Sequence, residues 1–375
     1  MLSFISFITE AAEGKKAHGI QHLEHPADRT FDSKDAAEHA LKTIKGVASG
    51  KTPITRKIDD KMSYHAMRDA NGKVGVKYKG SGSHYNFSAE DINKQHGHKP
   101  YLAHPLHALL SHLGKVLPKT PGEYQGGHMS TPDTRTTEGG KIHHTPNTIK
   151  YSADVSSPEG KALKRSKVST VIHSKIDKEG HASPITDTSD FGSHPDVHRA
   201  DHLVAKHERT LAPEHKADVT HHVKEAEKLM QGHTYGHLAG HDVHLRTYIN
   251  STVRSDAPVT VAGYKAHLAA KHDKLIAAVT TDKSKQAKTE KKNLDVAHIT
   301  KNKPAFQRTF DIHHHLQSAT NALAKGLDAA SHQHTETSIG GEKTGGEGYV
   351  GNGVKIVDRQ GFAKANLAAS ARFKK

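Results

Sequence analysis

The stretch Lys57-Ile58-Asp59-Asp60-Lys61-Met62-Ser63-Tyr64-His65-Ala66-Met67-Arg68 decides the fold that we expect for this chain. We predict that Lys57-Ile58-Asp59 opens a strand and that Tyr64–Arg68 forms the next one. Asp69-Ala70-Asn71-Gly72 has the composition of a tight turn, and Val74–Tyr78 alternates as a hairpin partner does. The sequence therefore predicts a lysine on a rigid strand end beside a β-hairpin.

The flanking regions divide into four segments: an N-terminal arm and helix over 1–50, a strand-rich part over 51–190, a helical part over 191–338, and final strands with a basic tail over 339–375. Helical spacing of apolar residues predicts helices around 33–48 and 101–117 and through most of 192–331. We expect further strands at Tyr124–Met129, Thr148–Tyr151, Val168–His173 and Gly348–Val357. The pattern indicates a mixed chain of helices and strands.

Composition narrows the function classes. The 375 residues contain no cysteine, which excludes disulfides, cysteine-ligated zinc and thiol catalysis. Lysine and arginine outnumber aspartate and glutamate by 54 to 40, which favours a polyanionic partner such as nucleic acid or nucleotides. No apolar run is long enough for a transmembrane helix, so we expect no membrane partner. The chain also contains 35 histidines, whose charge changes near pH 6.5 when they are unperturbed.

Lys57 is the first candidate for chemistry. A deprotonated lysine amine attacks the α-phosphorus of a nucleoside triphosphate, and burial or nearby cations depress the lysine pKa enough for that attack. The product is a lysyl–NMP phosphoramidate, and pyrophosphate leaves. Surface lysines beside aspartates are common, so an ordinary solvated Lys57 with Asp59 is the alternative.

Glu347-Gly348-Tyr349-Val350 and the following Lys355 form the second candidate. A carboxylate helps to hold Mg²⁺ or a ribose, and a lysine neutralises charge on a phosphoryl group in transfer. A glycine-rich surface hairpin is the alternative.

Together these motifs resemble the covalent nucleotidyltransferase superfamily of ATP-dependent DNA and RNA ligases and capping enzymes. Lys57-Ile58-Asp59-Asp60 resembles its K-x-D-G signature, and Glu347–Val350 resembles its E-G-x-V strand. More narrowly, the ordered set is similar to a family of uncharacterised ligase-like proteins of tailed phages. Further members of that set are Arg68-Asp69, Tyr124-Gln125-Gly126, Pro146-Asn147-Thr148-Ile149, Ile172-His173-Ser174-Lys175 and Val357-Asp358-Arg359.

Two positions depart from the family pattern. Asp60 stands where the signature has glycine, and Gly127 stands where the middle motif has an acid in the form Q-G-D. Aspartate tolerates left-handed backbone better than most residues, so the first departure is compatible with the fold. Both departures favour a protein that keeps the fold without the chemistry.

The resemblance implies an α+β fold with a ligase-type (ATP-grasp-like) core of antiparallel sheets. It covers most of 15–190 and 340–370, so the helical part 191–338 is expected to be a large insertion. It implies ATP or another nucleoside triphosphate and Mg²⁺ as cofactors. The implied partners are nucleic acid and phage head proteins. The implied location is the host cytoplasm, with packaging in the virion as an alternative.

The resemblance also assigns a role to each residue of the site. Lys57 is the nucleophile, Asp59 orients it or contacts the nucleotide, and Lys355 stabilises the transferring phosphoryl group. Glu347 is the metal ligand. The nucleotide-binding residues are Arg68 at the ribose or the acceptor, Glu123 or Gln125 at the ribose or base, and Lys175.

Three alternatives stay open. The chain is a polynucleotide ligase-like enzyme, a virion or head-associated protein without activity, or an enzyme that transfers the nucleotide to protein. The start, Met1–Glu10, resembles the leader of head-internal proteins of large phages, but an amphipathic segment packed on the core is the other interpretation. His233, His237, His241 and His244 have helical spacing that suits zinc, although chance spacing is expected in so histidine-rich a chain.

Overall fold

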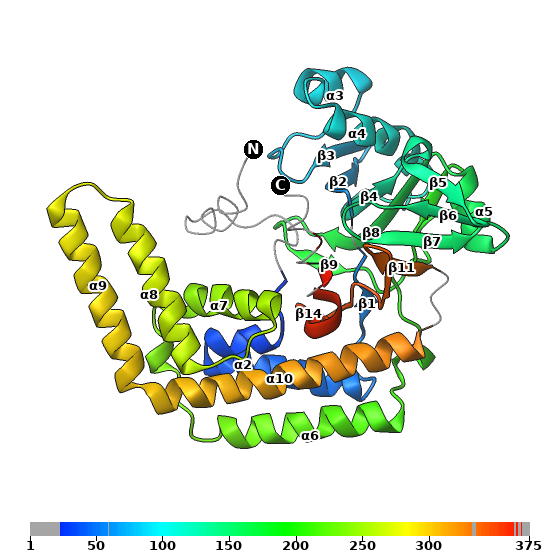
Figure 1. Cartoon of the computed structure of the whole chain (residues 1–375). Helices are drawn as coiled ribbons and strands as arrows, with labels where there is room; N and C mark the ends of the chain where they lie inside the picture. The colour runs from blue at the N-terminus through cyan, green and yellow to red at the C-terminus, as the bar shows by residue number, and fades with distance from the viewer. Residues whose placement is uncertain (1–22, 59, 332–334, 364, 367–368, 370–375) are drawn as a thin grey trace. The chain divides into compact units, whose positions relative to one another are not determined.

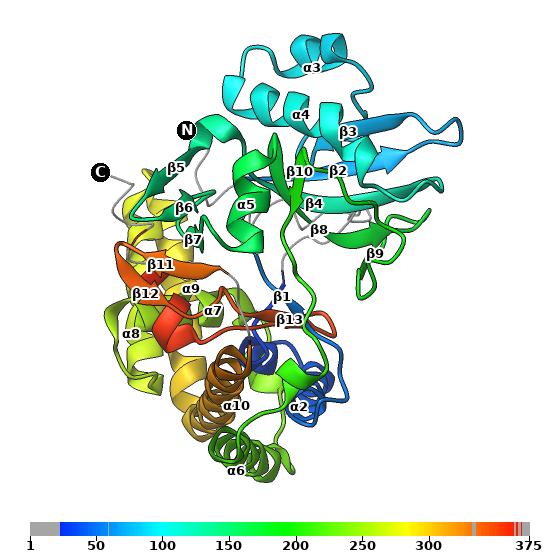
Figure 2. The same cartoon turned by 90° about the vertical axis from the view of Figure 1, so that its right-hand side faces the viewer.

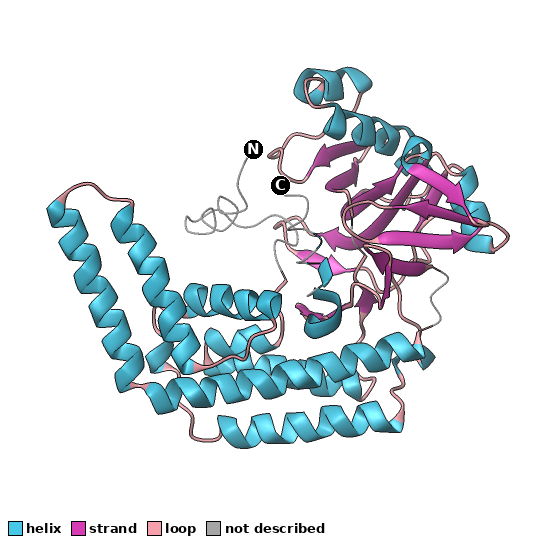
Figure 3. Cartoon of the chain, in the orientation of Figure 1, coloured by secondary structure: helices cyan, strands magenta, loops and turns pink. Residues whose placement is uncertain are grey.

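The computed structural model describes residues 23–58, 60–331, 335–363, 365–366 and 369 (Figure 1). Within them, helices combine with mainly antiparallel sheets, which confirms the expected mixture of the two (Figure 3). The chain divides into two compact units, each built from separated segments. Among the described residues, unit 1 comprises 60–135 and 162–200, and unit 2 comprises the described parts of 23–59, 136–161 and 201–369.

Unit 1 is organised around a sheet in the order β10-β8-β4-β2-β3, with β9 paired to β8. Its strands are β2 (Met62–Arg68), β3 (Val74–Tyr78), β4 (Gly122–Ser130), β8 (Val168–Ile176), β9 (Ala182–Pro184) and β10 (Val197–Arg199). The predicted hairpin of β2 and β3 is confirmed, with Tyr64 opposite Tyr78. Alternation of side chains along the strands puts Tyr64 and Ala66 on the buried apolar face.

Two helices complete the core of unit 1. They are α3 (Ala89–His96) and α4 (Pro100–His112), which is followed by the 3₁₀ turn Leu113–Lys115. Ser88 and Asp91 form a reciprocal capping box that starts α3. Leu106, Leu109 and Leu113 are fully buried against the apolar face of the sheet. The helix expected over 101–117 is thereby confirmed, with its last turn in tighter 3₁₀ form.

Unit 2 contains six of the longer described helices, each of which is labelled in Figure 1. They are α2 (Lys34–Ala48), α6 (Pro213–Met230), α7 (Asp242–Ser255), α8 (Val261–Ala277), α9 (Asp282–Lys301) and α10 (Lys303–Ala330). The Ser33 side chain accepts a hydrogen bond from the Ala36 N–H and caps α2. The helix α10 lies in the core, because Phe306, Phe310 and Leu316 fall on its buried face.

Unit 2 also contains two sheets. The strands β1 (Thr55–Arg56), β13 (Tyr349–Gly351) and β14 (Val354–Ile356) form one in the order β1-β13-β14. The other has the order β12-β11-β7-β6-β5, from β5 (Arg135–Glu138), β6 (Lys141–His144), β7 (Lys150–Asp154), β11 (Glu336–Ile339) and β12 (Glu342–Thr344). The helix α5 (Pro158–Arg165) spans residues of both units.

Three expectations about the elements need correction. The single strand expected over Gly348–Val357 is a hairpin, because Asn352 and Gly353 both have positive φ, as a two-residue type I′ turn requires. The helical part begins at Pro213 instead of near 192, since Val197–Arg199 pairs with β8 as a parallel strand. Lys57 does not open a strand but directly follows β1.

Candidate functional site

The small sheet β1-β13-β14 of unit 2 carries the candidate lysines. Thr55 lies opposite Val350, which in turn lies opposite Lys355. The Lys57 N–H donates to the Gly348 carbonyl at 2.8 Å, so the pairing continues past the end of β1. Because side chains alternate along a strand, Lys57 and Lys355 belong to the same face of the sheet. Tyr349 and Ile356 occupy the opposite face and are buried in the core.

Lys57 forms an ion pair with Glu347, through its Nζ and the carboxylate Oε1. The two residues are 290 positions apart in the sequence, so the fold brings the two motifs together. The Glu347 side chain is only 8% exposed, whereas that of Lys57 is 32% exposed. A buried carboxylate therefore holds a lysine that solvent reaches.

Gly348 explains why Glu347 reaches Lys57. Regular alternation would put Glu347 on the same face as Tyr349, which points into the core. Gly348 has a φ of 109°, outside the strand region, and this interrupts the alternation immediately before β13. A Cβ at this position would also overlap the carbonyl oxygen of Ile356. Only glycine fits this backbone, and the glycine turns the carboxylate toward Lys57.

Lys355 lies in the middle of the site. Its N–H donates to the carbonyl of Glu24 at 3.0 Å, which adds the segment before the first helix to the edge of the sheet. Burial, helped by the charge of Lys57, lowers the pKa of Lys355 to about 8. No hydrogen bond or ion pair reaches its ammonium from the part of the chain that the structure describes. Two cationic side chains thus lie close together, and one of them is partly desolvated and has no direct ion-pair partner among the described residues.

A buried ion-pair network centred on Asp28 lies in unit 2. The carboxylate of Asp28 accepts hydrogen bonds from Arg359 at 2.6 Å and from His313 at 3.1 Å. Burial alone would raise the pKa of Asp28, but Arg359 and His313 outweigh it and lower the pKa. Arg359 also donates to Asn250 at 2.7 Å. The network ties the 3₁₀ turn Ala27–Phe31 to α10 and to the residues after β14.

The remaining predicted residues need separate description. Asp59 lies outside the described residues. Arg68, Glu123, Gln125 and Lys175 belong to unit 1. The Arg68 guanidinium donates to the carbonyls of Gly72, Gly114 and Pro118, each at 2.8 Å, and is buried. This geometry gives Arg68 a structural role in holding the loop before β4, and its predicted ribose contact stays a prediction.

Glu123 and Gln125 share one face of β4. The sequence did not predict the hydrogen-bond partners of Glu123, which are Tyr85 and His65. The Glu123 carboxylate accepts from the Tyr85 hydroxyl and lies 3.0 Å from His65 Nδ1. Burial, and then Glu123, raises the pKa of Tyr85. In β2, His65 lies between the core residues Tyr64 and Ala66, so the alternation along the strand could have placed its side chain on the opposite face. Lys175 is exposed on β8.

The two departures from the family pattern, Asp60 and Gly127, meet in unit 1. A Cβ placed on Gly127 would overlap the Asp60 side chain and lie 2.7 Å from its Cγ. The Asp60 carboxylate accepts a hydrogen bond from Ser63 at 3.0 Å. The Asp60 carboxylate therefore occupies the space that a side chain at 127 would need.

The histidines weighed for zinc are used separately by the core of unit 2. His233 and His237 each place Nε2 3.0 Å from the Thr309 hydroxyl, and His241 Nδ1 lies 2.7 Å from the Tyr264 hydroxyl. His244 instead contacts Lys271. Three of the four are buried, and no three of them bring ligand atoms together. Their spacing serves packing and hydrogen bonding.

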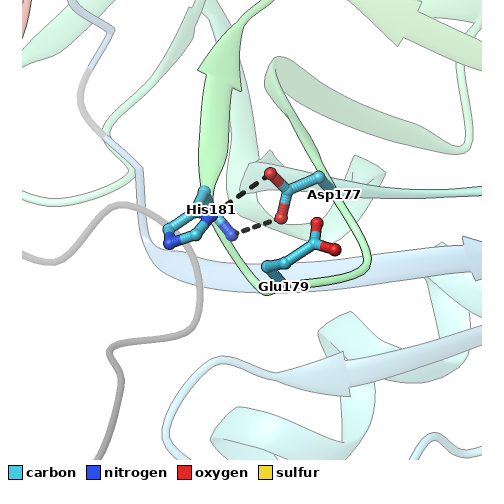
Figure 4. A group of neighbouring side chains, drawn as sticks. All are labelled: Asp177, Glu179 and His181. Atoms are coloured by element: carbon cyan, nitrogen blue, oxygen red, sulfur yellow. Dashed lines mark hydrogen bonds and ion pairs between the residues drawn. The ribbon is translucent and has the colours of Figure 1, made fainter.

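One close group of potential metal ligands does occur in unit 1, at the turn between β8 and β9. Figure 4 shows Asp177, Glu179 and His181, whose ligand atoms lie within 4.8 Å of one another. The Asp177 carboxylate accepts from the His181 N–H at 2.7 Å, which is the hydrogen bond of an ordinary turn. All three residues are exposed, so the turn itself accounts for the arrangement.

The chain belongs to a protein family described as a family of unknown function (DUF6267), which it matches over residues 20–371. That match includes Lys57, Glu347 and Lys355. No curated protein matches the chain, and no solved structure matches it either. None of the described helices is long and apolar enough to span a membrane.

Proposed function

We propose that this protein is a metal-dependent nucleotidyltransferase with a ligase-type core, in which Lys57 forms a covalent lysyl–NMP intermediate. The observation that carries the proposal is the meeting of Lys57, Glu347 and Lys355 on the β1-β13-β14 sheet. A nucleophilic amine, a carboxylate and a second cation are the groups that transfer of a nucleotide to lysine needs.

The residues fit a nucleoside triphosphate such as ATP. Lys355 supplies a partly desolvated positive charge beside Lys57, and an anionic phosphate would relieve the repulsion between them. Mg²⁺ is often held by one or two carboxylates together with substrate phosphates, so Glu347 is a sufficient protein ligand. When bound, Mg²⁺ neutralises charge on the phosphates and on the leaving group.

The reaction follows from these positions. The lone pair of Lys57 Nζ attacks the α-phosphorus, an N–P bond forms, the bond to the bridging oxygen breaks, and pyrophosphate leaves. The proton that Lys57 must lose passes to solvent, which reaches this 32% exposed side chain. Lys355 stabilises the negative charge that develops on the α-phosphoryl oxygens.

The acceptor belongs to the same proposal. The net charge of +14 favours a 5′-phosphorylated polynucleotide, DNA or RNA, over a neutral acceptor. The resemblance to phage proteins suggests action in the host cytoplasm, with head proteins as further partners when the chain is packaged.

Labelling with radioactive nucleotide tests the proposal. Wild type should take up label from α-labelled but not γ-labelled ATP or GTP in the presence of Mg²⁺, and the adduct should survive base and break in acid. Lys57→Ala and Lys57→Arg should abolish labelling, since a guanidinium stays protonated. Lys355→Met and Glu347→Gln should lower it by orders of magnitude. Lys51→Arg, a change at an exposed lysine of the same unit, should leave it unchanged.

A non-catalytic, virion-associated protein is the second candidate, and one observation favours it. Lys57 is held in an ion pair with a buried carboxylate, which stabilises its protonated, non-nucleophilic form. This alternative predicts that no variant and no nucleotide gives covalent labelling, whether or not equilibrium dialysis detects nucleotide binding.

A further inference from the structure

Four histidines gather where α6 packs against α10. The two helices lie side by side in Figures 1 and 2. His221 and His222 lie on α6, and His314 and His315 lie on α10. The rings of His222 and His315 have centroids 5.3 Å apart, and their Nδ1 atoms are 3.0 Å apart. His221 and His314 flank this pair, each with its ring about 5 Å from the ring of its neighbour in sequence.

The separation of the two nitrogens suits a shared metal ion. Zinc binds imidazole nitrogen at about 2.0–2.1 Å in tetrahedral geometry, which puts two such ligands roughly 3.3 Å apart. His222 and His315 come close to that separation without any change of rotamer. Burial, and then the neighbouring imidazoles, lower the pKa of both rings, so the neutral ligand form prevails at pH 7.

Two carboxylates lie near the pair. Glu225 on α6 and Asp311 on α10 both lie close enough to His315 to act on its charge. Glu225 follows His222 by three positions, and Asp311 precedes His315 by four, so each lies on the same helix face as its histidine. His222, Glu225, Asp311 and His315 are all half-buried, so an ion and its water ligands can reach the site from solvent.

We propose that His222 and His315 bind a divalent transition metal ion of the zinc class, and that this ion links α6 to α10. The first coordination shell is completed by His221, His314 or Glu225 after rotation of the side chain, and by water. Zinc, cobalt and nickel accept this mixture of imidazole and carboxylate ligands. The site is independent of the proposed nucleotidyltransferase reaction, because it shares no residue with Lys57, Glu347 or Lys355.

Metal binding by the full-length chain tests this inference. Chelator-treated protein should bind one equivalent of Zn²⁺ tightly in titration calorimetry, and Co²⁺ should give the visible absorption of a tetrahedral site. His222→Gln and His315→Gln should each remove the tight equivalent and the cobalt spectrum. His181→Gln, in the exposed turn of Figure 4, should change neither.

Thermal unfolding separates binding from folding. Zinc should raise the melting temperature of wild type, and the two glutamine variants should melt alike with and without zinc. Glutamine is a good helix former, and both positions are half-buried, so the variants should keep the far-UV circular dichroism of wild type. Many weak equivalents instead of one tight one, or a tight equivalent that survives both substitutions, would overturn the proposal.

Discussion

Because the Asp60 side chain fills the space beside Gly127, we predict that Gly127→Ala destabilises wild type but stabilises an Asp60→Gly variant. In wild type, Gly127→Ala adds a Cβ that would lie 2.7 Å from Asp60 Cγ. Overpacking of this kind costs about 1–3 kcal/mol. In an Asp60→Gly background the obstruction is gone, and alanine in the central strand β4 should then stabilise by roughly 0.5–1 kcal/mol, because glycine loses more backbone entropy on folding.

The coupling between the two positions is therefore about 1.5–4 kcal/mol, obtained from these two terms together. Asp60→Gly alone should cost about 1 kcal/mol, since Ser63 loses its 3.0 Å hydrogen bond. Urea unfolding followed by circular dichroism measures the four free energies of the cycle. Hydrogen exchange in peptides of β2 and β4 assigns the change to unit 1.

Gly126 provides the matched control. A Cβ on Gly126 would overlap the Val171 carbonyl oxygen and the Tyr64 hydroxyl, so the obstruction at this position does not come from Asp60. Gly126→Ala should therefore destabilise both backgrounds equally. If Gly127→Ala costs the same with and without Asp60, the two side-chain spaces do not overlap and the reasoning is refuted. The Asp60→Gly variant should also keep or raise nucleotide labelling, because it restores the residue of the family signature.

Three further predictions concern unit 2. Burial lowers the pKa of His233 and His241 to about 4, below the ordinary value near 6.5, so their stabilisation is present above pH 6.5 and is lost as the pH falls from there toward 4. The urea concentration at the midpoint of unfolding should therefore fall as the pH is lowered from 7 to 4.5, and it should fall less in His241→Gln. A midpoint that does not change with pH would exclude protonation of these histidines as a source of instability. Gly348→Ala should destabilise by about 1–3 kcal/mol and abolish labelling of Lys57, whereas Gly353→Ala, also at positive φ but facing open space, should cost less and keep labelling. Arg359→Leu leaves Asp28 charged and buried, so thermal melting should report a loss of about 3–5 kcal/mol, and adding Asp28→Asn should recover part of it; no recovery would mean that the ion pair is not the source.

Local patterns were sufficient for part of the fold. The alternation along β2 and β3 and the turn between them depend on residues close in sequence, and both are confirmed. The roles that the resemblance assigns to Lys57 and Glu347 place both in one site, and the structure brings the two side chains into contact. The hairpin turn at Asn352-Gly353 was available from sequence as well, since this pair is a typical type I′ signal.

Other features depend on contacts between residues that are far apart, which no local period encodes. The sequence alone determined which residue types could carry chemistry. Only the tertiary structure decided that Gly348 turns Glu347 toward Lys57. It also decided that the Arg68 guanidinium donates its hydrogen bonds to backbone carbonyls and that His222 contacts His315. The physical reason is that propensity and periodicity act within a few residues of chain, whereas strand pairing and helix packing join residues separated by loops of any length.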